Sequence, residues 1–254
     1  MEGNEKTKST QMKDPLHQFE IHTIIPLSLF GIDISITNST IFMLLAGILA
    51  IGVLSLGLSS NTSTRAPGKF TAFSEMLFNF IANLIDENCG AEAKKYLPFV
   101  MSVFMLIAMG NLLGMVPYSF TFTSHIIITF AMAALVFIIV TIIGFIHHGF
   151  RYLKIFLPDG APLFLAPILI PIELISYLSR PISLSVRLFA NIMAGHMVLK
   201  IFAGFVVGLG LLGGVLPLGM TVILTFFEIF VALVQAYIFS ILTCVYLNDA
   251  LHLH

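Results

Sequence analysis

The sequence contains no tryptophan and only two cysteines, and Asp, Glu, Lys and Arg together make up just 10% of its 254 residues. An average soluble domain has roughly 25% charged residues. Hydrophobic residues make up 58%, and the mean hydropathy is +1.01. Residues 96–150 contain no Asp, Glu, Lys or Arg. Because about 20 apolar residues cross a bilayer as a helix, this stretch alone has room for two crossings, and a soluble globular protein is excluded.

Other shortages exclude further classes of function. The formal net charge is -1 and the pI is about 6.7, so no basic surface indicates a nucleic-acid partner. Cys89 and Cys244 lie far apart without metal-site spacing, and we interpret them as unrelated buried or interfacial thiols. The sequence therefore predicts no metal, no cofactor and no nucleic acid.

The hydrophobic segments predict an all-α membrane protein with about five transmembrane helices and one interfacial amphipathic helix. Residues 1–39 are expected to form a polar N-terminal tail and outer segment, and residues 40–254 a single helical membrane domain. In chain order, the domain is predicted to contain a crossing at 40–60, the interfacial helix at 70–88, crossings at 96–117 and 124–147, and two long tilted helices at 162–208 and 217–248.

The interfacial helix is predicted from its apolar spacing. Phe73, Met76, Leu77, Phe80 and Leu84 recur at steps of three and four residues. This pattern is typical of a helix that lies in the interface with one apolar face.

The first of the two long helices exceeds what a perpendicular crossing needs. Residues 162–208 correspond to about 70 Å of helix, against about 30 Å of hydrocarbon. This helix is expected to tilt or bend, and the prolines within it predict kinks or a broken start. The glycine-rich segment 208–219 is expected to be the turn into the last helix, which gives an antiparallel hairpin.

The connections differ in their content of Lys and Arg. Those around residues 61–69, 86–95 and 147–160 contain basic residues, whereas 118–125 and 208–219 contain none. The positive-inside rule places the first group on the cytoplasmic or matrix side. The second group and the N-terminus are then expected on the outer side.

Five ionisable residues lie within the last two helices, away from loops and ends: Glu173, Arg180, Arg187, Lys200 and Glu228. Ionisable groups at membrane depth cost from about 2.5 to over 10 kcal/mol, so they mark pathways or have partners. Glu173, Arg180 and Arg187 are spaced by seven and share one side of a helix. For Arg180 and Lys200, a structural ion pair or a side chain reaching the interface is an open alternative.

In an antiparallel hairpin, facing residues have position numbers with a constant sum. The sum is 422 for Arg187 with Gln235 and 424 for His196 with Glu228. Half of either sum falls inside the glycine-rich turn. The sequence therefore predicts that these residues form two facing pairs. Such pairs are expected because a buried polar group needs a polar partner.

The same register places Glu173 opposite Asp249, near the inner end of the hairpin. Polar groups are thus expected at two depths, with Arg187 between them. Because arginine does not lose its proton, this layout indicates two aqueous access routes divided by a permanent positive charge.

These residues resemble a known family, subunit a of F-type ATP synthase. The resemblance lies in residues 171–196, which include Arg187-Leu-Phe-Ala-Asn191, in residues 227–239, and in residues 110–118. With the pattern of crossings, it covers nearly the whole chain.

The resemblance implies a proton-translocating stator subunit in the membrane sector of a rotary ATP synthase. By the motif of this family, Arg187 is the gate, Asn191 and Gln235 are its polar neighbours, His196 and Glu228 line the outer half-channel, and Glu173 belongs to the inner one. In some bacterial members the residue types at the His196 and Glu228 positions are exchanged.

The implied partners are a ring of rotor subunits that carry a carboxylate, peripheral-stalk b-type subunits and the lipid bilayer. ATP formation belongs to the partner catalytic head, so the chain is not expected to be an enzyme by itself. The expected location is a bacterial inner membrane, with the mitochondrial inner membrane as the alternative.

Two other functions are weighed against this one. A self-contained secondary transporter or ion channel would show internal repeats, and the sequence shows none. A membrane metalloenzyme would use histidines, but His147 and His148 are adjacent and do not form the i, i+4 pair that ligates metal well. We interpret these two, with His252 and His254, as solvated side chains. For His17, His22 and His125 the sequence indicates at most a contribution to the outer vestibule.

Overall fold

The computed structural model describes residues 21–26, 28–29, 32–33, 35–58, 68–116, 119–156 and 163–252. The predicted tail at residues 1–20, Pro117 with Tyr118, Pro162 and His254 lie outside these residues. So do the side chains at positions 211 and 212 in the turn.

Five helices are long and apolar enough to cross a membrane. They are α1 (Asn38–Leu58), α3 (Leu97–Gly114), α4 (Ile126–His148), α5 (Ala166–Gly208) and α7 (Val215–Leu251). A sixth helix, α2 (Lys69–Cys89), lies between α1 and α3 in the chain. The predicted fold class is confirmed.

Short elements connect the helices. Four short 3-10 helices are η2 (Ala91–Tyr96), η3 (Phe122–Ser124), η4 (Gly149–Phe156) and η5 (Leu163–Leu165), and α6 (Gly210–Gly213) joins α5 to α7. Gly210 has a φ of 69°, a conformation that favours glycine, so the α5–α7 turn depends on it.

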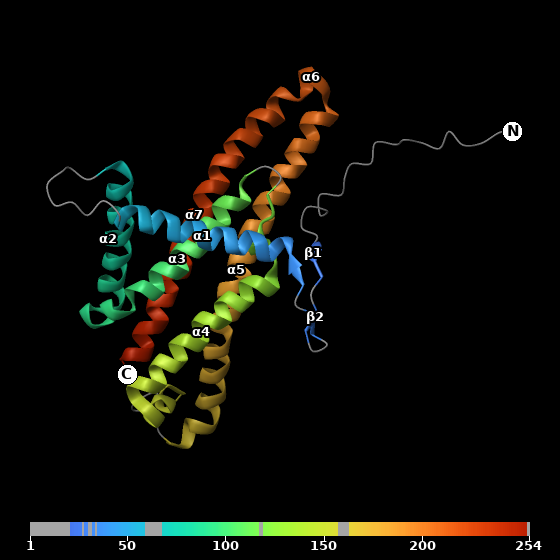
Figure 1. The fold of residues 1–254 in the computed structure, drawn as a ribbon. Helices are drawn as coiled ribbons and strands as arrows, with labels where there is room; N and C mark the ends of the chain where they lie inside the picture. Colours follow the sequence, from blue (N-terminus) through green and yellow to red (C-terminus); the bar gives the residue numbers. More distant parts are fainter. Residues whose placement is uncertain are drawn as a thin grey trace.

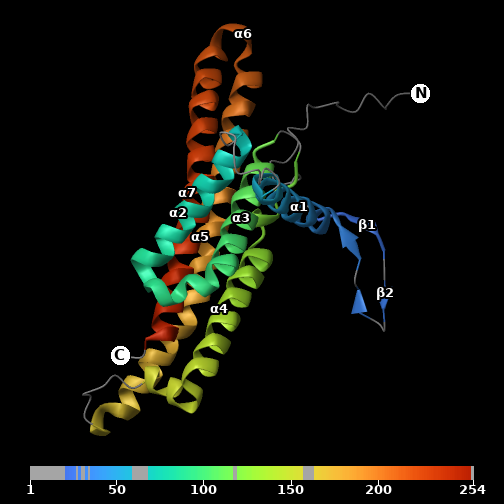
Figure 2. The same cartoon turned by 60° about the vertical axis from the view of Figure 1, so that its left-hand side comes forward.

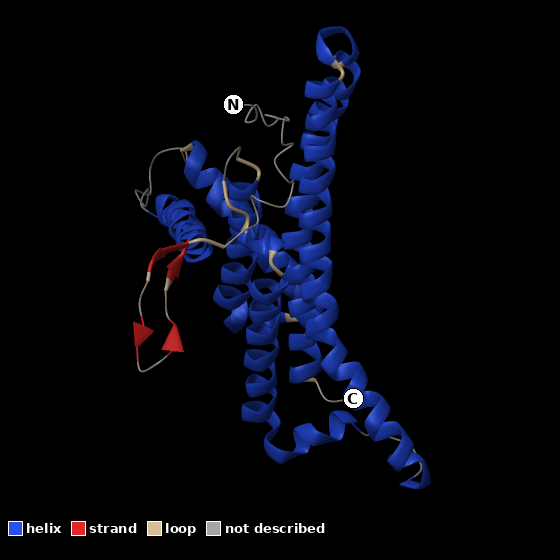
Figure 3. Ribbon diagram, turned by 90° about the vertical axis from the view of Figure 1, so that its right-hand side faces the viewer, coloured by secondary structure: helices blue, strands red, loops and turns tan. Residues whose placement is uncertain are grey.

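The sequence did not predict four short strands that precede α1. They are β1 (Thr23–Ile25), β2 (Ser28–Leu29), β3 (Ile32–Asp33) and β4 (Ile36–Thr37). β1 pairs with β4 and β2 pairs with β3, both antiparallel. The strands lie beside the helices as a separate arm (Figure 3). Pairs of only two or three residues lack the long alternating pattern by which strands are recognised in a sequence.

The apolar side chains of α2 fall into two groups. Ile81, Leu84 and Ile85 are buried against the bundle, whereas Phe73, Met76 and Phe80 are exposed. The hydroxyl of Ser74 donates a hydrogen bond to the carbonyl of Val53 on α1 at 2.8 Å. The exposed apolar side chains suit the interfacial location that the sequence predicts.

The bundle is organised around α7, which contacts α2, α3, α4 and α5. Helices α5 and α7 run antiparallel and form a long hairpin with α6 at its tip (Figures 1 and 2). Leu188 and Ile192 of α5 and Ala232, Ala236 and Phe239 of α7 are buried in the core. These apolar contacts hold the hairpin together between its polar groups.

Helix α5 has 43 residues, about 65 Å at the usual rise per residue. It continues through Pro171 and Pro181 as one helix, so the predicted broken start is confined to η5. Its N-terminal part extends beyond the end of α7 (Figures 1 and 2). Side chains on that part of α5 therefore have no residue of α7 facing them.

Candidate functional site

Arg187 is the central residue of α5, with 21 residues on either side of it. Its side chain is exposed, as is that of Asn191 one turn later. Among the described residues, no ion pair or hydrogen bond involves the Arg187 guanidinium. The exposed face around it is made mostly of small side chains: Ser183, Ala190 and Ala194.

Gln235 lies on α7 and is buried, with 5% of its surface exposed. No hydrogen bond joins it to Arg187 within the described chain. That these two residues face each other across the hairpin stays a prediction. The Arg187 side chain is exposed at the surface of the subunit.

His196 and Glu228 do face each other, as the register predicted. Nδ1 of His196 lies 3.3 Å from Oε1 of Glu228, and the two side chains are 10% and 4% exposed. A methyl group at Gly195 would lie 2.7 Å from the same carboxylate oxygen, so this glycine allows Glu228 to fit against α5.

The other side of the imidazole meets the segment that precedes α4. Nε2 of His196 lies 3.1 Å from the hydroxyl oxygen of Thr121. Both Glu228 oxygens are buried, and in the described structure neither has a hydrogen-bond partner. A buried ionised group with so few polar contacts is costly, so His196 is the polar side chain placed to interact with this carboxyl group.

Asn111 connects this region to two other elements. Its amide nitrogen donates to the carbonyl of Ala232 on α7 at 3.1 Å, and its oxygen accepts from the hydroxyl of Thr123 at 2.9 Å. We define the outer cluster by its residues: Asn111, Thr121, Thr123, His196 and Glu228. The sequence reasoning had assigned no role to the first three, although the polar run 121–125 in an otherwise uncharged stretch was a signal for them.

His125 lies next to the outer cluster. Its ring stacks on Phe120 with a centroid distance of 5.1 Å. Burial lowers the pKa of the His125 imidazole, and its Nε2 is buried without a hydrogen-bond partner among the described residues. Burial thus favours the neutral form of the imidazole, whose ring packs against Phe120.

A second polar group lies toward the opposite end of the hairpin. Nη1 of Arg180 donates to Oδ2 of Asp249 at 2.7 Å. The Arg180 guanidinium carbon lies 5.5 Å from the centre of the Tyr177 ring and 5.2 Å from that of Tyr246. We define these four residues as the inner cluster.

The inner cluster corrects the predicted partner of Asp249 and supports the structural ion pair that was considered for Arg180. Asp249 pairs with Arg180, not with Glu173, so the structural ion pair weighed for Arg180 is present. The position numbers of Arg180 and Asp249 have a sum of 429, which would place Glu173 opposite a position past the end of the chain. Glu173 is half-buried in the N-terminal part of α5.

Metal binding finds no support within the described ranges, where no group of three or more His, Cys, Asp or Glu is placed to hold an ion. His148 Nε2 instead lies 3.0 Å from the Leu251 carbonyl, and His252 Nδ1 lies 2.9 Å from the Asn248 side-chain oxygen. The buried Cys89 donates to the carbonyl of Cys244 at 3.0 Å.

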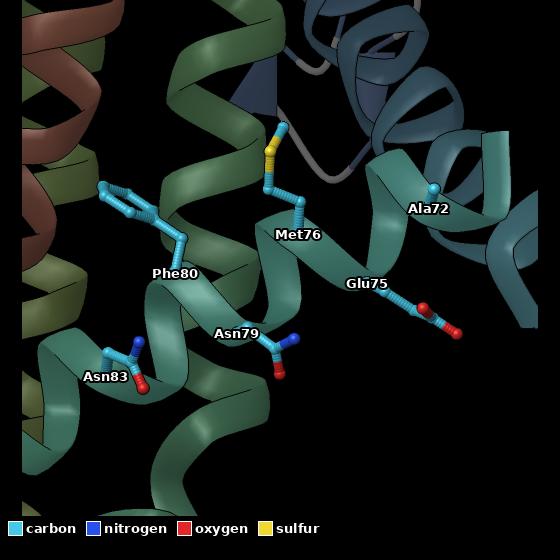
Figure 4. Close-up of a pocket in the computed structure, with 6 residues that line it drawn as sticks. All are labelled: Ala72, Glu75, Met76, Asn79, Phe80 and Asn83. Atoms are coloured by element: carbon cyan, nitrogen blue, oxygen red, sulfur yellow. The ribbon is translucent and has the colours of Figure 1, made fainter. Parts of the chain in front are cut away.

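A surface depression on α2 lies apart from these groups. It is lined by residues of a single helix face (Figure 4): Ala72, Glu75, Met76, Asn79, Phe80 and Asn83. No residue of the outer or inner cluster borders it, so it is not part of the candidate site.

The fold and the site together define a multi-pass membrane protein with ionisable groups at two depths of one helical hairpin. The family described as ATP synthase A chain matches residues 40–248. Relatives named ATP synthase subunit a agree with this match. The Rhodospirillum rubrum protein is 51% identical over 245 residues, which cover 96% of this chain and 100% of that protein. The Pelagibacter ubique protein is 50% identical over 242 residues, or 95% and 98% of the two chains.

A third relative with this name, from Rhizobium leguminosarum bv. trifolii, is 52% identical over 247 residues, or 94% of this chain and 97% of the relative. The chain belongs to the ATP synthase subunit a family. It is a membrane-sector subunit with a role in proton translocation, not the catalytic head, and it works in a complex with other subunits.

Proposed function

We propose that this chain is the stator of a rotary proton path, in which Arg187 separates two offset half-channels. Protons pass from one half-channel to carboxylates on a ring of rotor subunits, and leave through the other after the ring has turned. The single observation that carries this proposal is the position of Arg187 at the centre of α5, exposed and without an ion pair among the described residues.

The surface around Arg187 suits a moving partner. Small side chains let another helix approach closely, and Ser183, Ala190 and Ala194 are small and exposed. A carboxylate brought opposite the guanidinium is held ionised, because an adjacent opposite charge favours the charged form. The same carboxylate facing lipid takes up a proton because it is desolvated, so protonation depends on ring position.

The outer half-channel runs through the outer cluster. His196 and Glu228 exchange the proton, and Asn111, Thr121 and Thr123 hold the segment that covers them. Asn191 lies one turn from Arg187 on the exposed face, where it contacts the ring. Gln235 is a buried polar group on α7, between Glu228 and Asp249 along the helix.

The inner half-channel runs past Glu173. This residue is half-buried in the N-terminal part of α5, and the buried apolar residues Leu188 and Ile192 lie between it and His196 along the helix. Each charge that crosses about 100 mV carries about 2.3 kcal/mol. Because a proton enters and leaves at different ring positions, this energy drives rotation in one direction.

The complex includes the carboxylate-bearing ring and peripheral-stalk b-type subunits, and it resides in a bacterial inner membrane. The similar proteins from Rhodospirillum, Pelagibacter and Rhizobium support this location. The chain performs no covalent chemistry and is not itself an enzyme.

The test is ATP synthesis in inverted membrane vesicles that contain the intact complex. Arg187→Ala is expected to abolish proton-driven synthesis, with a loss above about a hundredfold, because the barrier between the half-channels is removed. Arg151→Ala, which removes an exposed arginine of η4, is the matched control and should keep the wild-type rate. Robust synthesis by Arg187→Ala would overturn the proposal, and proton transport by the chain alone in liposomes would favour a self-contained channel.

A further inference from the structure

The inner cluster holds α5 and α7 together at a defined point. The Arg180–Asp249 pair has an N–O distance of 2.7 Å, and its side chains are only 23% and 29% exposed. The Lys94–Asp86 pair, by comparison, is 2.9 Å long with exposures of 56% and 38%. Exposed ion pairs contribute little to stability, so the less exposed Arg180–Asp249 pair is expected to matter more than the Lys94–Asp86 pair.

The guanidinium of Arg180 lies close to two aromatic rings as well as to Asp249. Tyr177 on α5 and Tyr246 on α7 are both within about 6 Å of it, the range of cation–π attraction. Because the guanidinium is planar, it stacks and hydrogen-bonds at the same time, which an ammonium does less well. Arg180 thus contacts α7 through two different residues.

Tyr177 is itself fixed by a chain of hydroxyl groups. The Thr141 hydroxyl donates to the carbonyl of Phe137 at 2.7 Å, so Tyr177, which lies 2.8 Å from it, must donate to Thr141. Tyr152, at 3.0 Å, in turn donates to Tyr177. Each of the three hydroxyl hydrogens is donated in a hydrogen bond, and the last acceptor is a backbone carbonyl. This series of hydrogen bonds therefore anchors α5 to α4 and η4 and does not relay protons.

Arg187 lies between two such connections. The Arg180–Asp249 pair is seven residues before it on α5, and the His196–Glu228 pair is nine residues after it. The guanidinium of Arg187 has no ion pair in the part of the chain that is described. Its location relative to α7 therefore depends on how the α5 backbone is held at these two points.

We propose that Arg180 is a positioning residue: its contacts with Asp249, Tyr177 and Tyr246 hold the inner half of α5 against α7, and so place Arg187 opposite the partner ring. This inference rests on the proposed function of Arg187. It assigns to Arg180 a role in the geometry of the site, not in the transfer of protons.

The test uses the intact complex in inverted vesicles, with the amount of copurifying ring as the measure of assembly. Arg180→Gln is expected to lower the rate of ATP synthesis about tenfold, because charge-assisted hydrogen bonds contribute on this scale. Arg180→Lys keeps the charge and should lose only about threefold. Lys94→Gln removes the exposed pair on the same side of the membrane and should leave the rate unchanged.

The interaction itself is tested by combining substitutions. Asp249→Asn should match Arg180→Gln, and the double variant should show little further loss, because both remove one interaction. The reversed pair, Arg180→Asp with Asp249→Arg, should recover most of the rate lost in Arg180→Asp. If Arg180→Gln does not assemble, Arg180→Lys and the reversed pair carry the test because both retain opposite charges.

A wild-type rate in Arg180→Gln would overturn the inference, as would a reversed pair no better than Arg180→Asp, or an equal loss in Lys94→Gln. Arg187→Ala is measured in the same assay. If Arg187→Ala is inactive while Arg180→Gln is fully active, only the positioning role fails. If Arg187→Ala is active, the proposed function fails.

Discussion

The outer and inner clusters both include ionisable residues of the α5–α7 hairpin, yet these groups are satisfied to different degrees. In the outer cluster, Glu228 is buried with no hydrogen bond to either oxygen among the described residues, and His196 lies 3.3 Å away. In the inner cluster, Arg180 is paired and stacked, and Tyr177 has its proton committed to Thr141.

We interpret this difference as one between groups that exchange protons and groups that hold helices together. A buried ionised carboxylate is costly and is relieved by taking up a proton, whereas a fully satisfied network makes a structure rigid. Under the proposed function, the outer cluster belongs to the proton path. The inner half of that path would pass by Glu173, with the inner cluster fixing the helices around it.

Among variants that compare the two clusters, Glu228→Gln is expected to have the largest effect. The amide cannot carry the proton, so proton flux should fall about a hundredfold, the lower end of what a positioned proton-transfer group contributes. Flux is measured as ATP-driven acidification of inverted vesicles. Glu87→Gln, which changes an exposed acid of α2, is the control. Unchanged flux in Glu228→Gln would remove the distinction between the two clusters.

A smaller loss is expected from Gly195→Ala. The added methyl group would lie 2.7 Å from Oε1 of Glu228, so the carboxylate must move away from His196, and flux should drop about tenfold, the cost that small displacements of reacting groups can reach. Gly204→Ala on the same helix meets no atom within 4 Å and should be close to wild type. Equal rates in the two variants would show that the spacing between His196 and Glu228 does not matter.

The smallest effect on flux is expected from Tyr177→Phe. This change removes the hydroxyl but keeps the ring against Arg180, so it should cost about 1 kcal/mol of stability with no measurable loss of proton flux. Thermal unfolding of the purified complex and vesicle acidification measure the two quantities. A loss of flux as large as in Glu228→Gln would mean that the hydroxyl chain conducts protons.

The sequence predicted the helices well because hydrophobic length and charge are strong signals. Five membrane-spanning helices and the long hairpin followed from apolar runs, and the His196–Glu228 contact followed from the position of the glycine-rich turn. The short strands before α1 were missed because they involve only two or three residues each.

Register along the hairpin was less predictable. One fixed sum described the contact near the turn but placed Glu173, not Arg180, opposite Asp249. The facing positions shift along the two helices, and a long arginine side chain reaches further than a carboxylate. The sequence also did not show that Arg187 is exposed and Gln235 buried. Both are polar residues on strongly apolar helices, so their residue types do not distinguish them.

The most direct measurement is a structure of the intact membrane complex with its ring in place. The distance from the Arg187 guanidinium to the nearest carboxylate decides the question. We predict a carboxylate of a neighbouring ring subunit within ion-pair range, about 4 Å, on the face formed by Ser183, Ala190 and Ala194. A guanidinium that faces only lipid, or that is paired with an acid of its own chain, would contradict the role of Arg187.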